Sequence, residues 1–207
     1  MSRTVNPIRH AERRAALLEA AGALFAAQGF SGTTIAQVCA AAGVSSGQLF
    51  HYFPSKDALF AAIFEGDAAE ARAIFEDLAG WPDPLAALLE AVRRLAQPAA
   101  EMRVGALILD LIRRVERDAT LAAAVVAEEG VKHEGFADLV ARAQASGQAD
   151  PALDPAAAAG WLCTLIDAAF LHSAEEARDG AAMLLRTVAG FLAPPTPSAP
   201  TGEEAAP

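Results

Sequence analysis

The sequence has few of the residues on which most metal proteins and disulfide-bonded proteins depend. Its 207 residues include only two cysteines and four histidines, and neither set has the spacing of a metal or redox site. The HExxH pattern of zinc peptidases and the glycine-rich phosphate loop are both absent. We therefore expect no metal, no cofactor and no catalytic residues, and we predict that the chain is not an enzyme.

The sequence also lacks a long hydrophobic run and a signal peptide. The longest apolar run, residues 155–166, ends at Asp167, well short of the roughly 20 residues that a membrane helix needs. Residues 1–14 are polar and basic, without the apolar segment of a secretory signal. We expect no membrane partner and a cytoplasmic location.

Basic charge is scarce overall but gathers at one end of the chain. The whole chain has a net charge of -10, whereas residues 1–56 hold five Lys or Arg against two Glu. An acidic protein is a poor ligand for nucleic acid, so this asymmetry suggests a basic DNA-facing end and an acidic body. Plain solubility is a sufficient reason for the acidic body.

The abundant residues favour helices. Hydrophobic residues make up 54% of the chain, alanine is frequent, and apolar positions recur at helical spacing, which predicts an all-α fold. We expect an N-terminal three-helix domain at 1–55, a helical bundle for ligand binding and dimerisation at 56–193, and a proline-rich disordered tail at 194–207. The predicted helices span 9–28, 34–42, 46–52, 56–79, 84–96, 98–117, 119–146, 155–174 and 175–193.

The segment at 33–56 has the pattern of two short helices around a tight turn. A threonine at 33 or 34 suits the N-cap of the first helix, because its oxygen accepts an otherwise unpaired amide hydrogen. Gly43 suits a left-handed helix stop. Ser45, followed three residues later by Gln48, fits a capping box for the second helix. This pattern predicts a helix-turn-helix.

The second of these helices has an outer face that suits DNA. Leu49 and Phe53, four residues apart, should point inward, which leaves small, polar and aromatic side chains outside. Such uncharged groups fit base edges in a major groove. Ordinary packing in an all-α protein could also produce a short helix-turn-helix. The run Phe50-His51-Tyr52, followed by Lys56, favours contacts with sugar, phosphate and base instead.

Three motifs resemble the N-terminal domain of TetR-family transcriptional regulators. They are GFSGTT at 29–34, AGVS at 42–45 and GQLFHYFPSKDAL at 47–59, and the likeness runs from about residue 9 to residue 64. The resemblance implies a regulator, most often a repressor, that binds a palindromic operator on double-stranded DNA as a homodimer and responds to a small-molecule effector. It implies phosphate contacts by Thr34, Tyr52 and Lys56. The full predicted DNA-binding set is Thr34, Ser45, Ser46, Gly47, Gln48, Phe50, His51, Tyr52 and Lys56.

The sequence departs from the family pattern at two positions. Phe50 stands where the family often has tyrosine, so a hydroxyl contact is replaced by a possible contact with a thymine methyl group. Ile35 stands where some members use arginine to read guanine. Gln48 has two competing roles, since a glutamine that closes a capping box is less free to reach a base.

The last two predicted helices carry the prediction of a dimer. The helix at 155–174 is apolar around most of its circumference, so it must be buried on more than one side. One side can pack on its own domain and the other can pack on a second subunit, although a thick intramolecular core would have the same pattern. The predicted interface residues are Leu162, Leu165, Ile166, Ala169, Leu184, Val188 and Phe191.

The effector site is the least determined part of the prediction. Polar and aromatic side chains on or near apolar helices are candidates for lining a pocket. The candidates are Met102, Leu107, Asp110, Arg114, Phe136, Trp161, Thr164 and Asp167. Asp110 and Arg114 could equally pair along one helix. A mostly apolar pocket favours a hydrophobic or amphipathic ligand. The alternative function is a ligand-binding or interaction module whose helix-turn-helix no longer binds DNA.

Overall fold

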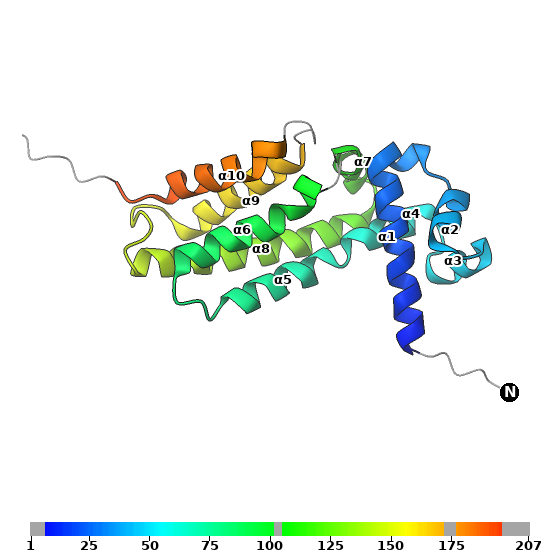
Figure 1. Ribbon diagram of the computed structural model, residues 1–207, viewed down its shortest axis with the longest axis horizontal. Helices are drawn as coiled ribbons and strands as arrows, with labels where there is room; N and C mark the ends of the chain where they lie inside the picture. The colour runs from blue at the N-terminus through cyan, green and yellow to red at the C-terminus, as the bar shows by residue number, and fades with distance from the viewer. Residues whose placement is uncertain (1–6, 102–104, 172–176, 196–207) are drawn as a thin grey trace, which may run out of the picture.

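The computed structural model describes residues 7–101, 105–171 and 177–195, and these ranges form ten helices and no strand. The all-α prediction is confirmed (Figure 1). The helices are α1 (Pro7–Gly32), α2 (Ile35–Ala42), α3 (Ser46–Tyr52), α4 (Lys56–Phe64), α5 (Asp67–Leu78), α6 (Pro84–Glu101), α7 (Gly105–Val115), α8 (Ala119–Ala145), α9 (Pro155–Leu171) and α10 (Ala177–Leu192). None of them is both long enough and apolar enough to cross a membrane.

Helices α1 to α4 form a small unit at one end of the molecule (Figure 1). Its core joins Leu17 and Phe25 of α1, Val38 of α2, Leu49 of α3 and Phe60 of α4, all almost completely buried. The two helices of the helix-turn-helix are too short to bury an apolar face alone, so α1 and α4 supply the surface on which they pack. The predicted three-helix unit therefore includes a fourth helix.

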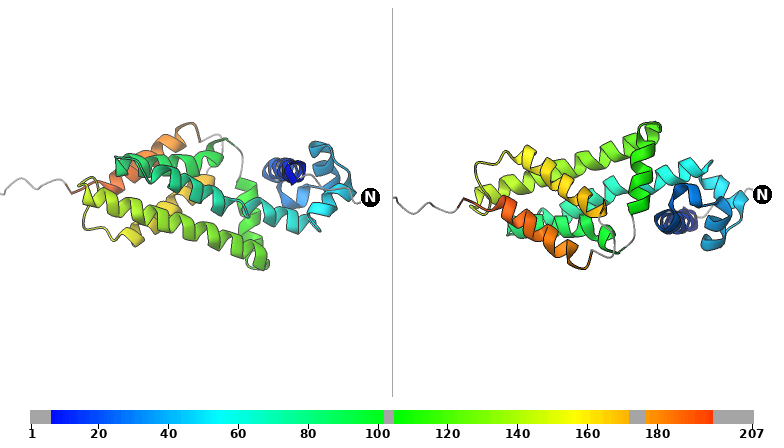
Figure 2. Two further views of the ribbon diagram at one scale, coloured as in Figure 1. Left: turned by 90° about the horizontal axis from the view of Figure 1, so that it is seen from below. Right: turned by 90° about the horizontal axis from the view of Figure 1, so that it is seen from above.

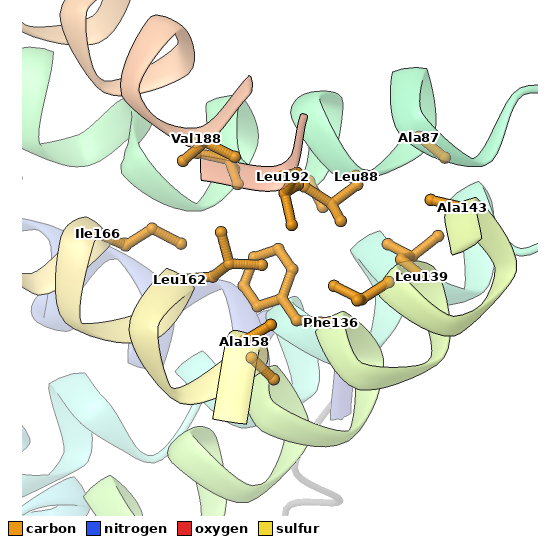
Figure 3. Close-up of a cluster of buried hydrophobic side chains, with 14 of the residues drawn as sticks. Ala87, Leu88, Phe136, Leu139, Ala143, Ala158, Leu162, Ile166, Val188 and Leu192 are labelled. Atoms are coloured by element: carbon orange, nitrogen blue, oxygen red, sulfur yellow. The ribbon is translucent and has the colours of Figure 1, made fainter. Parts of the chain in front are cut away.

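Helices α5, α6, α8, α9 and α10 form the larger bundle. Its core is a set of fully buried side chains that point toward one another from α6, α8, α9 and α10 (Figure 3). Phe136 of α8 lies beside Leu162 of α9 at its centre. The buried residues of this core that Figure 3 labels are Ala87, Leu88, Phe136, Leu139, Ala143, Ala158, Leu162, Ile166, Val188 and Leu192.

Helix α7 lies between the small unit and the bundle, as the two views of Figure 2 show. It contacts α1 on one side and α8 and α9 on the other. Leu107 is buried against the core of the small unit. Helix α4 also contacts α8, so two elements connect the small unit to the bundle.

Several helix boundaries differ from the sequence prediction. The single helix predicted at 56–79 is two helices, because the chain turns at Glu65 and Gly66 before α5 begins. A glycine loses more conformational entropy in a helix than other residues, which favours the break there. The helix predicted to stop before Pro98 continues to Glu101, and packing of its apolar face on α8, α9 and α10 outweighs one lost backbone hydrogen bond.

Candidate nucleic-acid interface and ligand cavity

The helix-turn-helix has the caps that its sequence predicts. The Thr34 hydroxyl accepts the Gln37 N–H at 3.2 Å and caps α2. Gly43 ends that helix with a φ of 65°, in the left-handed region that favours glycine. Ser45 then caps α3 by accepting the Gln48 N–H at 3.2 Å. These local bonds fix the angle at which α3 leaves the turn.

Ser45 also stands at the centre of the letters GVSSG, which match the GxSxG pattern of hydrolase nucleophiles. Its hydroxyl, however, bonds only to Gln48 among the described residues, and no histidine reaches it. A serine without a base is not an activated nucleophile. The motif is here a helix cap.

Helix α3 presents the outer face that the sequence predicts. Leu49 and Phe53 are buried in the core of the small unit, and the exposed positions of α3 carry no formal charge. Phe50 is 48% exposed, which is unusual for so large an apolar side chain. The exposed residues are Ser46, Gly47, Gln48, Phe50 and His51.

The capping box decides which part of Gln48 is free. The Gln48 Oε1 accepts the Ser45 N–H at 3.0 Å, so the oxygen is engaged within the helix. The amide Nε2, which donates two hydrogens, has no partner among the described residues. Gln48 can therefore offer a donor to DNA without giving up its cap, whereas reading adenine through both amide atoms would break the cap.

All three residues with implied phosphate contacts already have partners within the protein, Thr34 through the cap of α2 described above. The Lys56 Nζ donates to the Thr33 carbonyl at 2.5 Å and lies 4.2 Å from the centre of the Phe30 ring. Partial burial, followed by the nearby Arg114 charge, lowers the Lys56 pKa. Tyr52 is half-buried, with its ring centre 4.5 Å from that of His10. Both Lys56 and Tyr52 still reach the surface of the small unit, and their DNA contacts stay predictions.

A cavity of about 440 Å³ lies where α4, α5, α6, α7, α8 and α9 meet. This volume is within the usual range for sites that bind small molecules. Its apolar wall is Ile63, Phe64, Ala71, Ile74, Leu95, Leu107, Ile108, Leu111, Ile112, Val115, Val125, Ile166 and Phe170. Its charged residues are Asp67, Glu70, Arg94, Glu128, Glu129, Lys132 and Asp167.

Lys132 is the buried cation of this cavity. Its ammonium pairs with Glu128 at 3.3 Å, with Asp167 at 3.5 Å and with Glu129. Burial opposes the charge, but these three carboxylates outweigh it and raise the Lys132 pKa. Burial, the neighbouring Glu128 and then Glu70 raise the Asp67 pKa to about 7.

The structure brings two of the predicted ligand residues to this cavity. Leu107 and Asp167 line it. The other described candidates do not line this cavity. Phe136 is completely buried in the bundle core, because the close packing of α8 on α9 leaves no space beside it. Met102 lies outside the described residues.

Two further candidates, Trp161 and Thr164, lie on the outside of α9. Trp161 is 61% exposed, and the exposed Thr164 hydroxyl bonds to the Gly160 carbonyl at 2.9 Å. Helix α9 is apolar on two faces, and these residues belong to the face that points away from the bundle. Periodicity alone does not distinguish the two faces.

The last two candidates, Asp110 and Arg114, join α7 to the small unit. The Asp110 Oδ2 accepts the Phe30 N–H at 2.6 Å, and the Arg114 guanidinium lies 3.5 Å from the centre of the Phe30 ring. Arg114 also pairs with Asp57 of α4. Gly29, with a φ of 73°, turns the chain so that the Phe30 N–H points at α7. The predicted pairing of Asp110 with Arg114 is not observed.

Four of the predicted interface residues belong to the core of their own chain. Leu162, Ile166 and Val188 are at most 1% exposed and Leu184 is 8% exposed, so these side chains lie inside the subunit rather than on its outer surface. The close packing of α9 and α10 on α6 and α8 buries them (Figure 3). Leu165, Ala169 and Phe191 are half-buried, and their contact with a partner stays a prediction.

Several charged residues of the cavity were not among the candidates. Asp67, Glu128 and Lys132 line it, yet the predicted site named none of them. A signal for Lys132 was present. Lys132 follows Leu121 by eleven residues and Val125 by seven on α8, and Phe136 comes four residues later, so Lys132 lies on the helix face that points inward.

Comparison with known proteins agrees with the predicted helix-turn-helix. Residues 17–63 match the family model described as bacterial regulatory proteins, tetR family. The HTH-type transcriptional regulator RutR of Escherichia coli (strain K12) is 40% identical over 85 residues, which span 39% of this chain and 38% of RutR. The regulator UidR of the same strain is 27% identical over 152 residues, covering 73% of this chain and 76% of UidR.

The likeness extends over the second part of the chain in three dimensions. The structure of Salmonella enterica GusR has a TM-score of 0.67, with 26% sequence identity, and the match covers 92% of this chain and 99% of that one. Since the curated relatives are named as transcriptional regulators, the prediction that the chain is not an enzyme is confirmed. Residues 17–63 therefore carry the helix-turn-helix DNA-binding domain of the TetR family of bacterial regulatory proteins, and the chain is similar over most of its length to an HTH-type transcriptional regulator.

Proposed function

We propose that this protein is a repressor that binds a palindromic operator as a homodimer and is released by a small effector bound in the cavity. The observation that carries this proposal is the position of α7. One side of α7 lines the cavity with Leu107 and Leu111, and its Asp110 and Arg114 bond to the small unit. A ligand that displaces α7 would therefore move the part of the molecule that reads DNA.

The DNA-reading part of the proposal rests on α3. Two copies of this helix would enter successive major grooves, with half-sites about one helical turn apart. Gln48 would donate its free amide hydrogens to a base acceptor, such as guanine O6 or thymine O4. Phe50 would make an apolar contact with a thymine methyl group. We place the protein in the cytoplasm because such a regulator must reach DNA.

We propose a subunit interface on the outer faces of α9 and α10. Trp161 and Met183 are 61% and 57% exposed, and exposed large apolar side chains often mark a contact with another protein. Small or half-buried residues surround them at helical spacing, which allows two helices to approach closely. These are Thr164, Leu165, Ala168, Gly180, Thr187 and Gly190.

We also propose a revised division of the chain. Leu59, Phe60 and Phe64 of α4 pack in the core of the small unit, so the DNA-binding unit extends to about residue 64 rather than 55. The bundle then begins with α5. The tail at 194–207 remains a proposal, and residues 196–207 lie outside the described residues.

The effector mechanism differs from a simple lever through one long helix. Because the chain turns at Glu65 and Gly66 between α4 and α5, a tilt of α5 is not passed on rigidly to α4. Helix α7 offers a direct connection, since Asp110 reaches the end of α1 and Arg114 reaches the start of α4. For release, the effector must bind the displaced state better, and a coupling of about 1–3 kcal/mol would weaken operator binding some five- to 150-fold.

Gel shift with DNA that flanks the protein's own gene tests the proposal. We expect a specific complex that competitor DNA of random sequence does not remove, with a stoichiometry of one or more dimers for each fragment. Phe50→Ala should weaken it, whereas Trp81→Ala, at an exposed aromatic on the bundle, should not. If no fragment gives a specific complex, the chain is instead a helical binding module that no longer reads DNA.

A further inference from the structure

The cavity has two chemically different ends. All lining residues from α4 and α7 are apolar, while every charged residue of the wall comes from α5, α6, α8 or α9, which also supply six apolar residues. A ligand that fills the cavity must therefore place an apolar part against one end and meet ionised groups at the other. This inference rests on the proposed function, in which the cavity holds the effector.

Negative charge exceeds positive charge at the polar end. Five carboxylates line the cavity, against two cations. One of these cations, Arg94, bonds to Glu90 at 2.8 Å and to Asp77 at 2.7 Å, and neither of these acids lines the cavity. The charge of Arg94 is thus already balanced outside, which leaves Lys132 as the cation that faces five acids.

Lys132 has no remaining capacity for a further acid. An ammonium has three hydrogens to donate, and Glu128, Glu129 and Asp167 each lie within pairing distance of it. Asp67 stays outside this group, because within the described ranges no hydrogen bond or ion pair reaches its carboxylate. The Asp67 oxygens are not fully buried, since no buried side-chain oxygen without a partner occurs among the described residues, and Asp67 lines the cavity.

An unpaired carboxylate at a partly buried position opposes folding when it is ionised. The raised pKa of Asp67 reflects this, with burial as its largest cause and Glu128 as the next. A neutral side chain of similar size would avoid the penalty. Groups with this combination of burial, missing partner and cavity position are candidates for ligand contacts.

We propose that the effector is an amphipathic cation, with a protonated amine or amidinium group that binds beside Asp67 and an apolar body that fills the end of the cavity formed by α4 and α7. An anion would be repelled by the five carboxylates. A neutral apolar molecule would leave Asp67 unpaired. A cation gives this carboxylate a charged partner, and it reduces the excess of negative charge in the cavity.

Three probes of equal chain length and different charge test the proposal. They are decylammonium, decanol and decanoate, each titrated by calorimetry into the full chain without DNA at pH 7.5. We expect decylammonium to bind at least about tenfold more tightly than decanol, because a charge-assisted hydrogen bond in a shielded site strengthens binding by that order. Decanoate should bind most weakly.

Asp67→Asn should lower the affinity for decylammonium at least about tenfold and leave the affinity for decanol unchanged. The matched control is Glu76→Gln, which removes one exposed negative charge from the same helix outside the cavity, and which should change neither affinity. The circular dichroism of each variant verifies its fold.

The results separate this inference from the proposed function. Equal binding of the amine and the alcohol, or no effect of Asp67→Asn, would overturn the assignment of a cation. Binding of none of the probes would overturn it too. Operator binding is measured separately by gel shift on the same samples. If the protein forms a specific DNA complex but does not prefer the cation, the proposed regulator function stands and only the proposed ligand class is refuted. If it prefers the cation but forms no DNA complex, the ligand class stands and the regulator function is refuted.

Discussion

Removing the contact between α7 and the small unit should loosen that unit without changing its DNA-contacting residues. The contact consists of the Asp110 carboxylate on the Phe30 N–H, at 2.6 Å, and the Arg114 guanidinium over the Phe30 ring, at 3.5 Å. Asp110→Ala leaves the Phe30 N–H without its partner, which costs about 1–3 kcal/mol. Arg114→Ala removes a cation–π contact of about 0.5–2 kcal/mol. Its ion pair with the half-exposed Asp57 adds little.

Hydrogen exchange measures this effect at the residues concerned. The Phe30 amide should exchange some five- to 150-fold faster in Asp110→Ala, which corresponds to about 1–3 kcal/mol. Amides of the bundle core, such as that of Phe136, should be unaffected. Arg117→Ala is the control, because it removes a neighbouring exposed arginine whose described contacts are backbone bonds only.

The same variants test the route from the cavity to the DNA. Neither Asp110 nor Arg114 lines the cavity, so the affinity for the ligand should not change. The ratio of operator affinities measured without and with ligand should fall toward one. Reciprocity requires that the effect of operator on ligand affinity shrinks equally. Unchanged exchange at Phe30, or an undiminished effect of ligand on operator binding in both variants, would refute the role given to α7.

Three other changes have definite expected results. Lys56→Ala should weaken binding to all DNA sequences alike, whereas Gln48→Ala should relax the preference at one or two positions by about 1–3 kcal/mol, as read by anisotropy over single-base operator variants. Met183→Glu should split the dimer in sedimentation, because an unpaired charge in an apolar interface costs several kcal/mol; a dimer of unchanged affinity would contradict the proposed interface. Asp67→Asn should raise the free energy of unfolding above pH 7 by up to about 4 kcal/mol, since the folded pKa of about 7 exceeds the ordinary aspartate pKa of 3.8. The gain should vanish near pH 4, where Asp67 is protonated in the folded chain and increasingly in the unfolded chain, and chemical denaturation at both pH values measures it.

The helix-turn-helix could be predicted residue by residue because its signals are local. Ser45 and Gln48 are three positions apart, and this spacing alone specifies the bonds that start α3. Leu49 and Phe53 are buried as their spacing predicts. The family resemblance adds roles for these residues, but their positions follow from caps and periodicity.

The cavity could not be predicted in the same way, because it forms among six helices that are distant in the sequence. Each helix has several apolar positions, and only the packing of its neighbours decides whether an apolar side chain fills a core or lines a cavity. Phe136 and Ile166 illustrate this. Both are buried, but Phe136 is packed within the bundle core, whereas Ile166 also borders the cavity.

The proposed subunit interface shows a second feature that helical periodicity could not predict, namely which side of α9 faces outward. Helix α9 was predicted to have two buried sides, and the larger aliphatic residues were assigned to the partner. The structure reverses this, since Leu162 and Ile166 face the core of their own chain and Trp161 faces outward. Interfaces often contain exposed aromatic residues and methionine, which makes Trp161 and Met183 the better signals.

Helix α7 shows how a short element can connect two sites. Leu107 and Leu111 line the cavity, and Asp110 and Arg114 bond to the small unit. Both pairs have a spacing of about one helical turn. A ligand that turns or shifts α7 must therefore move both pairs together. Because hydrogen bonds weaken steeply beyond about 3.2 Å, a displacement of about 1 Å is enough to break the 2.6 Å bond between Asp110 and Phe30. The geometry thus converts a small movement at the cavity into the loss of a specific contact beside the helix-turn-helix.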